Sequence, residues 1–356
     1  MTMHRLVLPF GIFISYELIS IARAPLPWHS VEVVITSATY LALFIFLQSK
    51  VDSGQQRIWE NTIISIGAFF VLFNLYLTAN ALRDWYLLNT SVSFSVPFRY
   101  RLPGGFLVHP NYEAAFINLI IPLLIGRLII KKTISSRLGI AALLTLFALS
   151  LYFTSSRGGW IAGTVGIIVT IMISGLAIAI QRRLSLKNIA TMIGPRLKKL
   201  LITFGIIGTL VIVSGLYVLV SSTGRPPLWP SREKPWTMGW EIFSSAPIWG
   251  HGAGSVHVLI PQAPSTPPYY LTHTHNILLQ LGSELGLVGI LLLGWSLFLI
   301  GRTLILTFRR QGYEERIHIA AISGVLAATA VHHLVDYTLE VPIISATLLF
   351  MIASLG

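Results

Sequence analysis

The sequence of 356 residues contains no cysteine, which excludes disulfide bonds, a thiolate nucleophile and cysteine-based metal sites. Charged residues are also scarce, because Asp, Glu, Lys and Arg make up only 11% of the chain. A typical soluble domain carries about 25%. Hydrophobic residues make up 54% of the chain. This composition excludes an ordinary soluble domain and predicts an integral membrane protein.

Acidic ligands for a metal are few. The chain has three aspartates, Asp52, Asp84 and Asp336, and no Asp-x-Asp pair that would hold Mg²⁺ or Mn²⁺. We therefore expect no metal and no cofactor. The net charge of +12 does not indicate a nucleic-acid partner either. In a membrane protein such an excess reflects cytoplasmic loops that face anionic lipid headgroups.

Apolar segments recur along the whole chain, and roughly 20 mostly apolar residues suffice for a spanning helix. We predict an all-α polytopic protein in which residues 1–356 form a single membrane domain. The first segment is interpreted as a retained helix and not as a signal peptide, because Glu17 interrupts it and Pro25 follows the candidate cleavage site. The ten predicted spans are Leu6–Ala22, Val31–Gln48, Thr62–Ala79, Tyr112–Ile130, Leu138–Thr154, Trp160–Ile180, Leu200–Ser221, Asn276–Ile300, Ile317–His332 and Val341–Leu355.

The distribution of basic residues sets the expected orientation. The segments Lys131–Arg137, Arg182–Lys199 and Arg302–Arg316 are rich in Lys and Arg and fall on one side of the predicted bundle. That side is expected to be cytoplasmic, together with both termini. Residues 80–111 then form a first outer loop, and residues 222–275 form a long outer loop over the site.

The predicted outer face carries seven arginines but a single lysine, Lys234. Either residue serves as cytoplasmic positive charge. A surface that uses arginine and avoids lysine indicates bidentate recognition of phosphate or carboxylate. Contact with the headgroups of the outer leaflet is the alternative. The seven residues are Arg23, Arg83, Arg99, Arg101, Arg157, Arg225 and Arg232.

A tight outer turn, Ser155–Trp160, joins two predicted spans and contains one arginine followed by two glycines. Glycine permits close backbone approach, and the N-terminus of the following helix favours an anion. Arg157 is therefore interpreted as a pyrophosphate-binding residue. The alternative is an arginine that extends to the membrane interface beside an anchoring Trp160.

The first outer loop ends in His109, Pro110 and Asn111. Asn111 is a plausible N-cap of the next helix, and Glu113 suits its positive end. Capping does not account for His109, which we expect could touch a polar ligand.

The long outer loop contains four tryptophans, of which Trp236 and Trp240 are one turn apart, as in a short helix that lies in the membrane interface. Gly250–Gly254 has the composition of a phosphate loop, but no buried strand precedes it. A dinucleotide-binding motif therefore has little support.

The loop ends near His273, and an apolar helix is predicted to begin there, with His275 and Asn276 in its first turn, and to run on through Gly286. A neutral histidine there can accept a proton from a hydroxyl group. An isolated histidine at this depth is more often an interfacial polar residue, but its polar neighbours favour a catalytic base. Later in the chain, His333 and Asp336 are spaced so that the carboxylate could orient the imidazole or simply satisfy it as structure.

These residues together resemble the bacterial O-antigen ligase and O-antigen polymerase superfamily. Each motif alone is weak, whereas their order on one predicted face is specific, over roughly residues 99–342. The matching motifs are His109-Pro-Asn111, Ser156-Arg157-Gly158-Gly159-Trp160, Arg232-x-x-x-Trp236, Pro247-x-x-Gly250-x-Gly252-x-Gly254, His275-Asn276-x9-Gly286-x-x-Gly289 and Asp336.

The resemblance implies a metal-independent membrane glycosyltransferase similar to the GT-C class, in the inner membrane of a bacterium. Such an enzyme moves a glycan from a polyprenyl (undecaprenyl) pyrophosphate carrier to a sugar hydroxyl on a glycolipid or glycan acceptor, as in lipopolysaccharide synthesis. By the same resemblance His275 corresponds to the catalytic base, and Arg157 and Arg232 bind the donor pyrophosphate. The expected supporting residues are Arg99, Arg101, His109, Arg225, His273, Asn276, His333 and Asp336.

Two other functions are compatible with the sequence. A polymerase of the same superfamily would join repeat units on the carrier lipid. A transporter of lipid-linked glycans or anions would differ in class, but such proteins usually show internal repeats and charge relays inside the membrane. Here the polar clusters are confined to one predicted face, and only Glu17 is clearly within a span. The chain is also shorter than many ligases of the family, which leaves the acceptor open.

Overall fold

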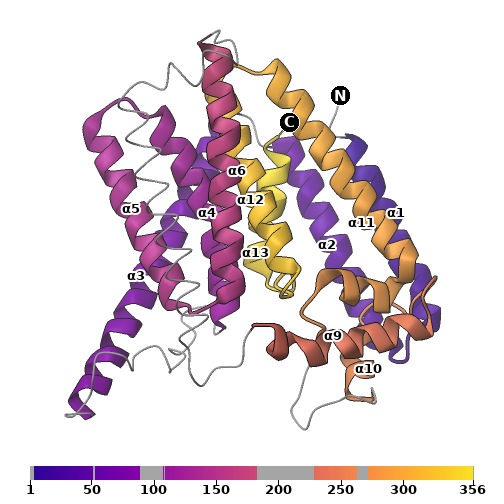
Figure 1. The fold of residues 1–356 in the computed structure, drawn as a ribbon. Coiled ribbons are helices and arrows are strands. Elements are labelled where there is room, and N and C mark those ends of the chain that lie inside the picture. The colour runs from indigo at the N-terminus through magenta and orange to yellow at the C-terminus, as the bar shows by residue number, and fades with distance from the viewer. Residues whose placement is uncertain are drawn as a thin grey trace. The chain divides into compact units, whose positions relative to one another are not determined.

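A computed structural model describes residues 4–50, 53–88, 107, 109–182, 228–262 and 272–355. Every regular element in these ranges is a helix, which confirms the prediction of an all-α protein (Figure 1). The elements are α1 (His4–Ser20), the 3-10 helix η1 (Ile21–Arg23), α2 (Pro27–Lys50), α3 (Ser53–Leu88), α4 (Pro110–Ile130), α5 (Ile134–Phe153), α6 (Arg157–Gln181), α9 (Leu228–Ser245), α10 (Val256–Leu259), η3 (Ile260–Gln262), α11 (Ile277–Arg310), α12 (Tyr313–His333) and α13 (Pro342–Ala353).

Seven of the described helices are long and apolar enough to cross a membrane, and each overlaps one predicted span. They are Leu6–Arg23, Pro27–Lys50, Gly54–Ala81, Pro110–Ile130, Ile134–Phe153, Arg157–Gln181 and Ile277–Arg310. The predicted span at 200–221 lies outside the described residues. The last two predicted spans correspond to α12, with 21 residues, and to the apolar α13, with 12. The count of ten therefore stays a prediction.

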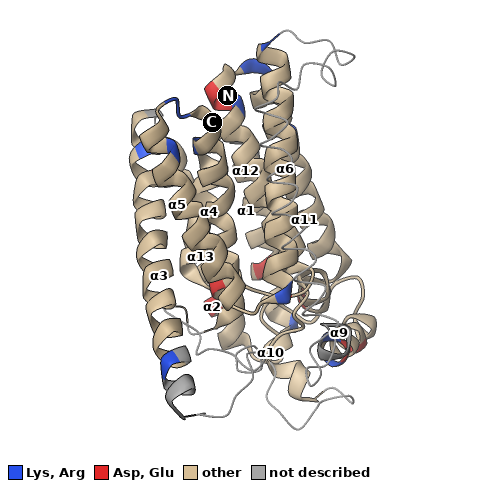
Figure 2. Ribbon diagram, turned by 60° about the vertical axis from the view of Figure 1, so that its left-hand side comes forward, with Lys and Arg blue, Asp and Glu red and all other residues tan. Residues whose placement is uncertain are grey.

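Charged side chains are rare on the bodies of these helices and gather mainly near their ends, as Figure 2 shows. Each of the seven candidate spans contains an 18-residue stretch with at most two charged residues. Among the exceptions is Glu17, which lies within α1 and is 5% exposed. This distribution is the one that a helical membrane protein requires, because an isolated charge in hydrocarbon is costly.

The chain divides into two compact units. The first consists of Met1–Glu60, Leu228–Arg309 and His332–Gly356; the second consists of Asn61–Pro227 and Arg310–Val331. The unit that contains His275 is called the first unit below, and the unit that contains Arg157 the second.

In the second unit α4 is the central helix. Nearly every residue of α4 from Asn111 to Gly126 is buried, and the helix packs on α5 and α6. Its contact with α6 is close because of glycine: a Cβ atom on Gly163 would lie 2.6 Å from Oδ1 of Asn118. A helix that is hydrophobic on all sides belongs in an interior, which agrees with this position.

In the first unit α1 packs on α2, and α2 also packs on α13 (Figure 1). The hydroxyl of Tyr16 in α1 donates to the carbonyl oxygens of Trp249 and of Leu285 in α11. Across the end of these helices runs α9, whose Met238 and Ile242 form a small core with Val256. The helix predicted around Trp236 and Trp240 is therefore confirmed as part of α9.

The prediction that the helix after His275 runs unbroken through Gly286 is wrong. Gly286 has φ 64° and ψ −162°, so α11 is interrupted there. The amide of Leu287 donates to the carbonyl oxygen of Pro247 at 2.8 Å instead of to its own helix. A Cβ atom on Gly286 would collide with the carbonyl group of Ile248. Glycine is therefore needed for this break, since it adopts positive φ and admits a second backbone.

Candidate active site in the first unit

The segment 272–276 precedes α11 and carries the predicted base. The expectation that His275 and Asn276 belong to the first helical turn is wrong, because α11 begins at Ile277. Asn276 caps the helix: its Oδ1 accepts from the amides of Leu278 at 2.9 Å and Leu279 at 3.1 Å. His275 lies outside the helix with φ 53°, a left-handed conformation that is uncommon for a residue with a Cβ atom.

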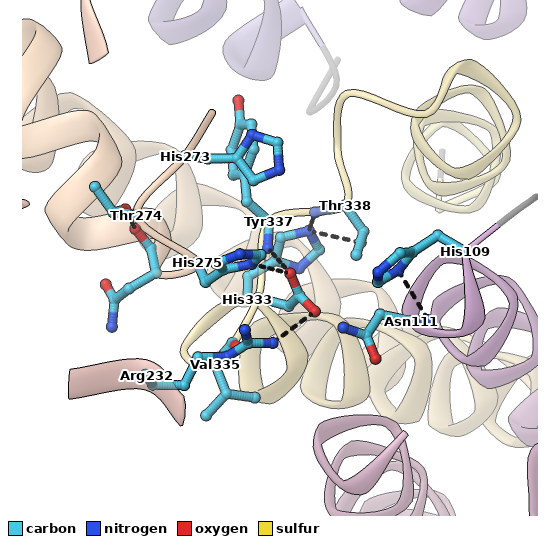
Figure 3. Close-up of polar contacts among 12 residues, drawn as sticks. His109, Asn111, Arg232, His273, Thr274, His275, His333, Val335, Tyr337 and Thr338 are labelled. Carbon is cyan, nitrogen blue, oxygen red and sulfur yellow. Dashed lines mark hydrogen bonds and ion pairs between the residues drawn. The ribbon is translucent and has the colours of Figure 1, made fainter. Parts of the chain in front are cut away.

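His275 is hydrogen-bonded to Asp336. Its Nδ1 lies 2.8 Å from Oδ1 of the carboxylate (Figure 3). An ionised carboxylate only accepts hydrogen bonds, so Nδ1 must carry the proton and Nε2 is left as the acceptor nitrogen. This is the tautomer that a general base needs when it takes a proton at Nε2.

The pairing of Asp336 with His333 stays a prediction. His333 ends α12, and the helical turn continues one step further, because the amide of Asp336 donates to the carbonyl oxygen of His332 at 2.9 Å. Nε2 of His333 lies 3.1 Å from the hydroxyl of Thr338 (Figure 3). One side of the His333 ring is thereby tied to the loop that follows α12, and the carboxylate of Asp336 binds His275.

Asp336 also accepts two further hydrogen bonds. The guanidinium of Arg232 donates from one terminal nitrogen to Oδ2 at 3.2 Å, and the amide of Tyr337 donates to Oδ1 at 2.8 Å. Arg232 is oriented by a second bond, from Nε to the carbonyl oxygen of Val335 at 2.9 Å. Burial raises the pKa of the Asp336 carboxyl, but the hydrogen bond from His275 and the charge of Arg232 outweigh it. The net pKa is well below its usual range, so Asp336 is an anion.

A second imidazole lies against the first. The rings of His273 and His275 meet edge to face, with centroids 5.2 Å apart. Nε2 of His273 is 3.7 Å from a carboxylate oxygen of Glu340, which is more exposed than the histidine. Burial lowers the pKa of His273, and the charge of Glu340 only partly opposes this effect. His273 therefore favours its neutral form in the folded protein.

The second unit holds the other predicted site residues that the structure describes. Arg157 is the first residue of α6, and the hydroxyl of Ser156 caps this helix by accepting from the amide of Gly159 at 3.1 Å. The indole of Trp160 donates to the carbonyl oxygen of Leu151 at 2.8 Å. Arg157 thus begins a helix at a fixed turn, as its anion-binding interpretation requires.

His109 has a structural role that the sequence did not reveal. It is the N-cap of α4, and its Nδ1 accepts from the amide of Asn111 at 3.3 Å. Asn111 was the expected cap but lies within the helix, which begins at Pro110. Three other predicted supporting residues, Arg99, Arg101 and Arg225, lie outside the described residues. Over the part of the chain that is described, no group of three or more His, Cys, Asp or Glu residues could hold a metal ion.

Sequence reasoning missed the contacts that fix the backbone of the segment 272–276. The indole of Trp236 donates to the carbonyl oxygen of His275 at 3.4 Å, and the amide of Thr274 donates to Oε1 of Gln280 at 3.1 Å. Gln280 and Glu284 are four residues apart on α11, a spacing that would have placed them together on one helical face. Nothing in the sequence linked that face to the segment before the helix.

Residues 140–294 match a sequence model of the family described as O-antigen ligase. The matched segment covers less than half of the chain. It includes three of the predicted site residues with assigned roles, Arg157, Arg232 and His275, but not Asp336. No curated protein matches the chain.

Proposed function

Because this match places the chain in the O-antigen ligase and polymerase superfamily of membrane glycosyltransferases, we propose that it transfers a glycan from a polyprenyl pyrophosphate carrier. The acceptor is a sugar hydroxyl at the outer face of the bacterial inner membrane. One observation carries the proposal, namely the 2.8 Å contact between Nδ1 of His275 and the buried carboxylate of Asp336.

His275 acts as the general base in this proposal. Its Nε2 takes the proton from the acceptor hydroxyl while that oxygen attacks the anomeric carbon of the donor glycan. The bond from the anomeric carbon to the diphosphate oxygen breaks, and the lipid diphosphate leaves with the electron pair. A single displacement of this kind inverts the anomeric carbon. Asp336 positions the imidazole and stabilises the imidazolium that forms.

The departing lipid diphosphate gains negative charge, and arginine can stabilise that charge without a metal ion. We assign Arg232 and Arg157 to this task. Arg232 lies beside the catalytic pair through Asp336, and its guanidinium is fixed by the carbonyl oxygen of Val335. Arg157 adds a cation to a helix N-terminus, which itself favours an anion.

Ligase and polymerase use the same step and differ in the acceptor. A ligase would transfer the glycan to a glycolipid such as lipid A core, whereas a polymerase would transfer it to a repeat unit on a second carrier. The acceptor that is consumed distinguishes the two. We place ligase activity first because the matching family bears that description.

The test is glycan transfer by the purified protein, with a defined polyprenyl-pyrophosphate oligosaccharide as donor and a panel of acceptors. A chelator is present throughout. We expect the wild type to transfer glycan and the variants Arg157→Ala, Arg232→Ala and His275→Ala to be impaired. Removal of a general base costs about 10²–10⁴ in rate, so the loss in His275→Ala should lie in that range.

Glu315→Gln is the matched control, because Glu315 is an exposed residue of α12 and its substitution should leave transfer unchanged. Equal turnover by His275→Ala would remove His275 as the base. If no acceptor is glycosylated while the donor still binds, and sealed vesicles carry the lipid-linked glycan across the membrane, the protein is a transporter.

A further inference from the structure

A hydrogen-bonded chain runs from the catalytic segment into α11. Thr274 is fully buried, and its amide donates to Oε1 of Gln280 at 3.1 Å. Its hydroxyl donates to the carbonyl oxygen of Asn276 at 2.9 Å. The methyl group of Thr274 lies against α9, where a Cβ atom on Gly239 would be only 2.7 Å away. The residue directly before His275 is therefore held from two helices.

The series of hydrogen bonds continues from Gln280 to Glu284. Nε2 of Gln280 donates to Oε1 of Glu284 at 2.7 Å. The orientation of the Gln280 amide is fixed at its other end, because the backbone amide of Thr274 can only donate and must face the oxygen of Gln280, which leaves the nitrogen for Glu284. The carboxylate of Glu284 also accepts from the backbone amides of Gly254 and Val256. Gln280 and Glu284 thus connect Thr274 to the glycine-rich segment 250–254.

The three glycines of that segment all have positive φ. Gly250 and Gly252 pack against protein backbone, and Gly254 packs against the side chains of His29 and Val33. A Cβ atom on Gly250 would collide with the carbonyl of Glu284, and one on Gly252 would lie 2.8 Å from the carbonyl oxygen of Ser20. The amide of Gly252 also donates to the carbonyl oxygen of Glu284 at 2.8 Å. The glycine-rich segment is therefore a close junction between α1 and α11 and not a cradle for phosphate.

His275 requires such support. A residue with a side chain in the left-handed region is strained by about 1–3 kcal/mol and persists only where its surroundings fix it. Asp336 binds the side chain of His275, and Trp236 binds its carbonyl oxygen. One residue earlier, the side chain of Gln280 binds the backbone amide of Thr274.

We propose that Gln280 and Glu284 are positioning residues for the catalytic base. They form an amide–carboxylate bridge that transmits the fixed position of the 250–254 junction to Thr274 and so to His275. The proposal rests on the transferase function proposed above. If the bridge positions His275, the rate of glycan transfer depends on the order of hydrogen-bond donors and acceptors along the bridge, and not only on the size of the two side chains.

Two single substitutions of nearly equal volume test this order. Glu284→Gln sets one amide nitrogen against another, or turns Gln280 so that its nitrogen faces the amide of Thr274. Gln280→Glu sets two carboxyl groups against each other. The double variant Gln280→Glu/Glu284→Gln restores the bridge, because residue 280 accepts from Thr274 and residue 284 donates to residue 280 while its oxygen accepts from the loop amides.

We expect each single variant to lower kcat for glycan transfer about 10²-fold, the cost of a catalytic group misplaced by about 1 Å, without a change in the KM for donor. The double variant should recover most of that loss. The ¹⁵N NMR signal of His275 should show the Nδ1–H tautomer in the wild type and the double variant, and a mixture in the single variants. Ser296→Ala is the control, since that hydroxyl bonds to the carbonyl oxygen of Leu292 within α11.

Melting temperatures of all variants in detergent separate a positioning role from a loss of fold. The proposal is overturned if the single variants keep wild-type kcat, or if the double variant is no better than either of them. In both cases the wild type transfers glycan and His275→Ala does not, so the general-base function stands. Failure of the wild type to transfer any glycan would instead remove the proposed function itself.

Discussion

Asp336 is bound both by the proposed base, His275, and by one of the proposed diphosphate-binding arginines, Arg232. Oδ1 accepts from the imidazole of His275, and Oδ2 accepts from the guanidinium of Arg232. The carboxylate is 3% exposed, so solvent does little to screen either contact. A change in the position of Arg232 when the donor diphosphate binds would therefore alter the electrostatic field at the base.

Asp336→Asn should abolish most transfer without removing volume. An asparagine nitrogen in place of Oδ1 faces the amide of Tyr337 and leaves His275 with its proton on Nε2, where it cannot accept one from the acceptor hydroxyl. In the other orientation the nitrogen faces the guanidinium of Arg232, and in both the negative charge that stabilises the imidazolium is lost. We expect kcat to fall by about 10²–10⁴, as for loss of the base itself. The initial rate of glycan transfer measures this effect. A double variant with His275→Ala should be no slower than either single variant, and additive losses would contradict the shared role.

The lowered pKa of His273 makes stability depend on pH in a defined direction. In the unfolded chain His273 binds a proton with a pKa near 6.5, whereas in the folded protein burial lowers this pKa and keeps the imidazole neutral to a lower pH. The free energy of unfolding is therefore not reduced by His273 above pH 6.5. It falls as the pH drops below 6.5, by at most about 1.4 kcal/mol per pH unit. His273→Gln should flatten the decrease in melting temperature below pH 6.5, measured in detergent.

Glu340→Gln is the companion variant, because the charge of Glu340 raises the pKa of His273 and its removal should steepen the decrease. An unchanged slope in both variants would show that another group titrates in this range. Asp336 does not interfere, since its pKa is lowered from 3.8 and its contribution is lost only at still lower pH.

The residues of the site were easier to predict than their partners. His275 and Arg232 were recognised because an ionisable side chain at the expected membrane surface is energetically costly and is usually kept for a function. The pairing of Asp336 with His275 spans 61 positions, and helical spacing within α12 pointed to His333 instead. His109 shows the reverse case. It was expected to contact a ligand, and the structure shows that it caps α4. Short-range patterns do not determine long-range partners.

At the scale of elements, the break in α11 is predicted to be indispensable. Gly286→Ala forces a side chain into a backbone conformation that essentially only glycine adopts, which costs about 1–3 kcal/mol, and places a methyl group against the carbonyl of Ile248. The melting temperature and the transfer rate should both fall. Gly294→Ala is the control on the same helix, because a Cβ atom there meets nothing within 4 Å. That variant should match or exceed the stability of the wild type, by up to about 1 kcal/mol.

Equal melting temperatures for Gly286→Ala and Gly294→Ala would show that the break is not required. The example also explains why helices were predicted better than their irregularities. Long apolar segments identified seven spans, because length and hydropathy are local properties of the sequence. The break depends on Pro247 and Ile248, which approach Gly286 from about 40 residues earlier in the chain.

At the scale of the whole molecule, the absence of cysteine gives a direct test of orientation. A single cysteine in place of Lys234, which is exposed on α9 two residues after Arg232, should react with a membrane-impermeant maleimide in intact cells. A single cysteine in place of Lys132, in the exposed basic loop before α5, should react only after the membrane is permeabilised. Both variants should keep wild-type transfer. The reverse labelling pattern would place Arg232 in the cytoplasm and exclude transfer at the outer face, because the basic loops set the orientation on which that assignment depends.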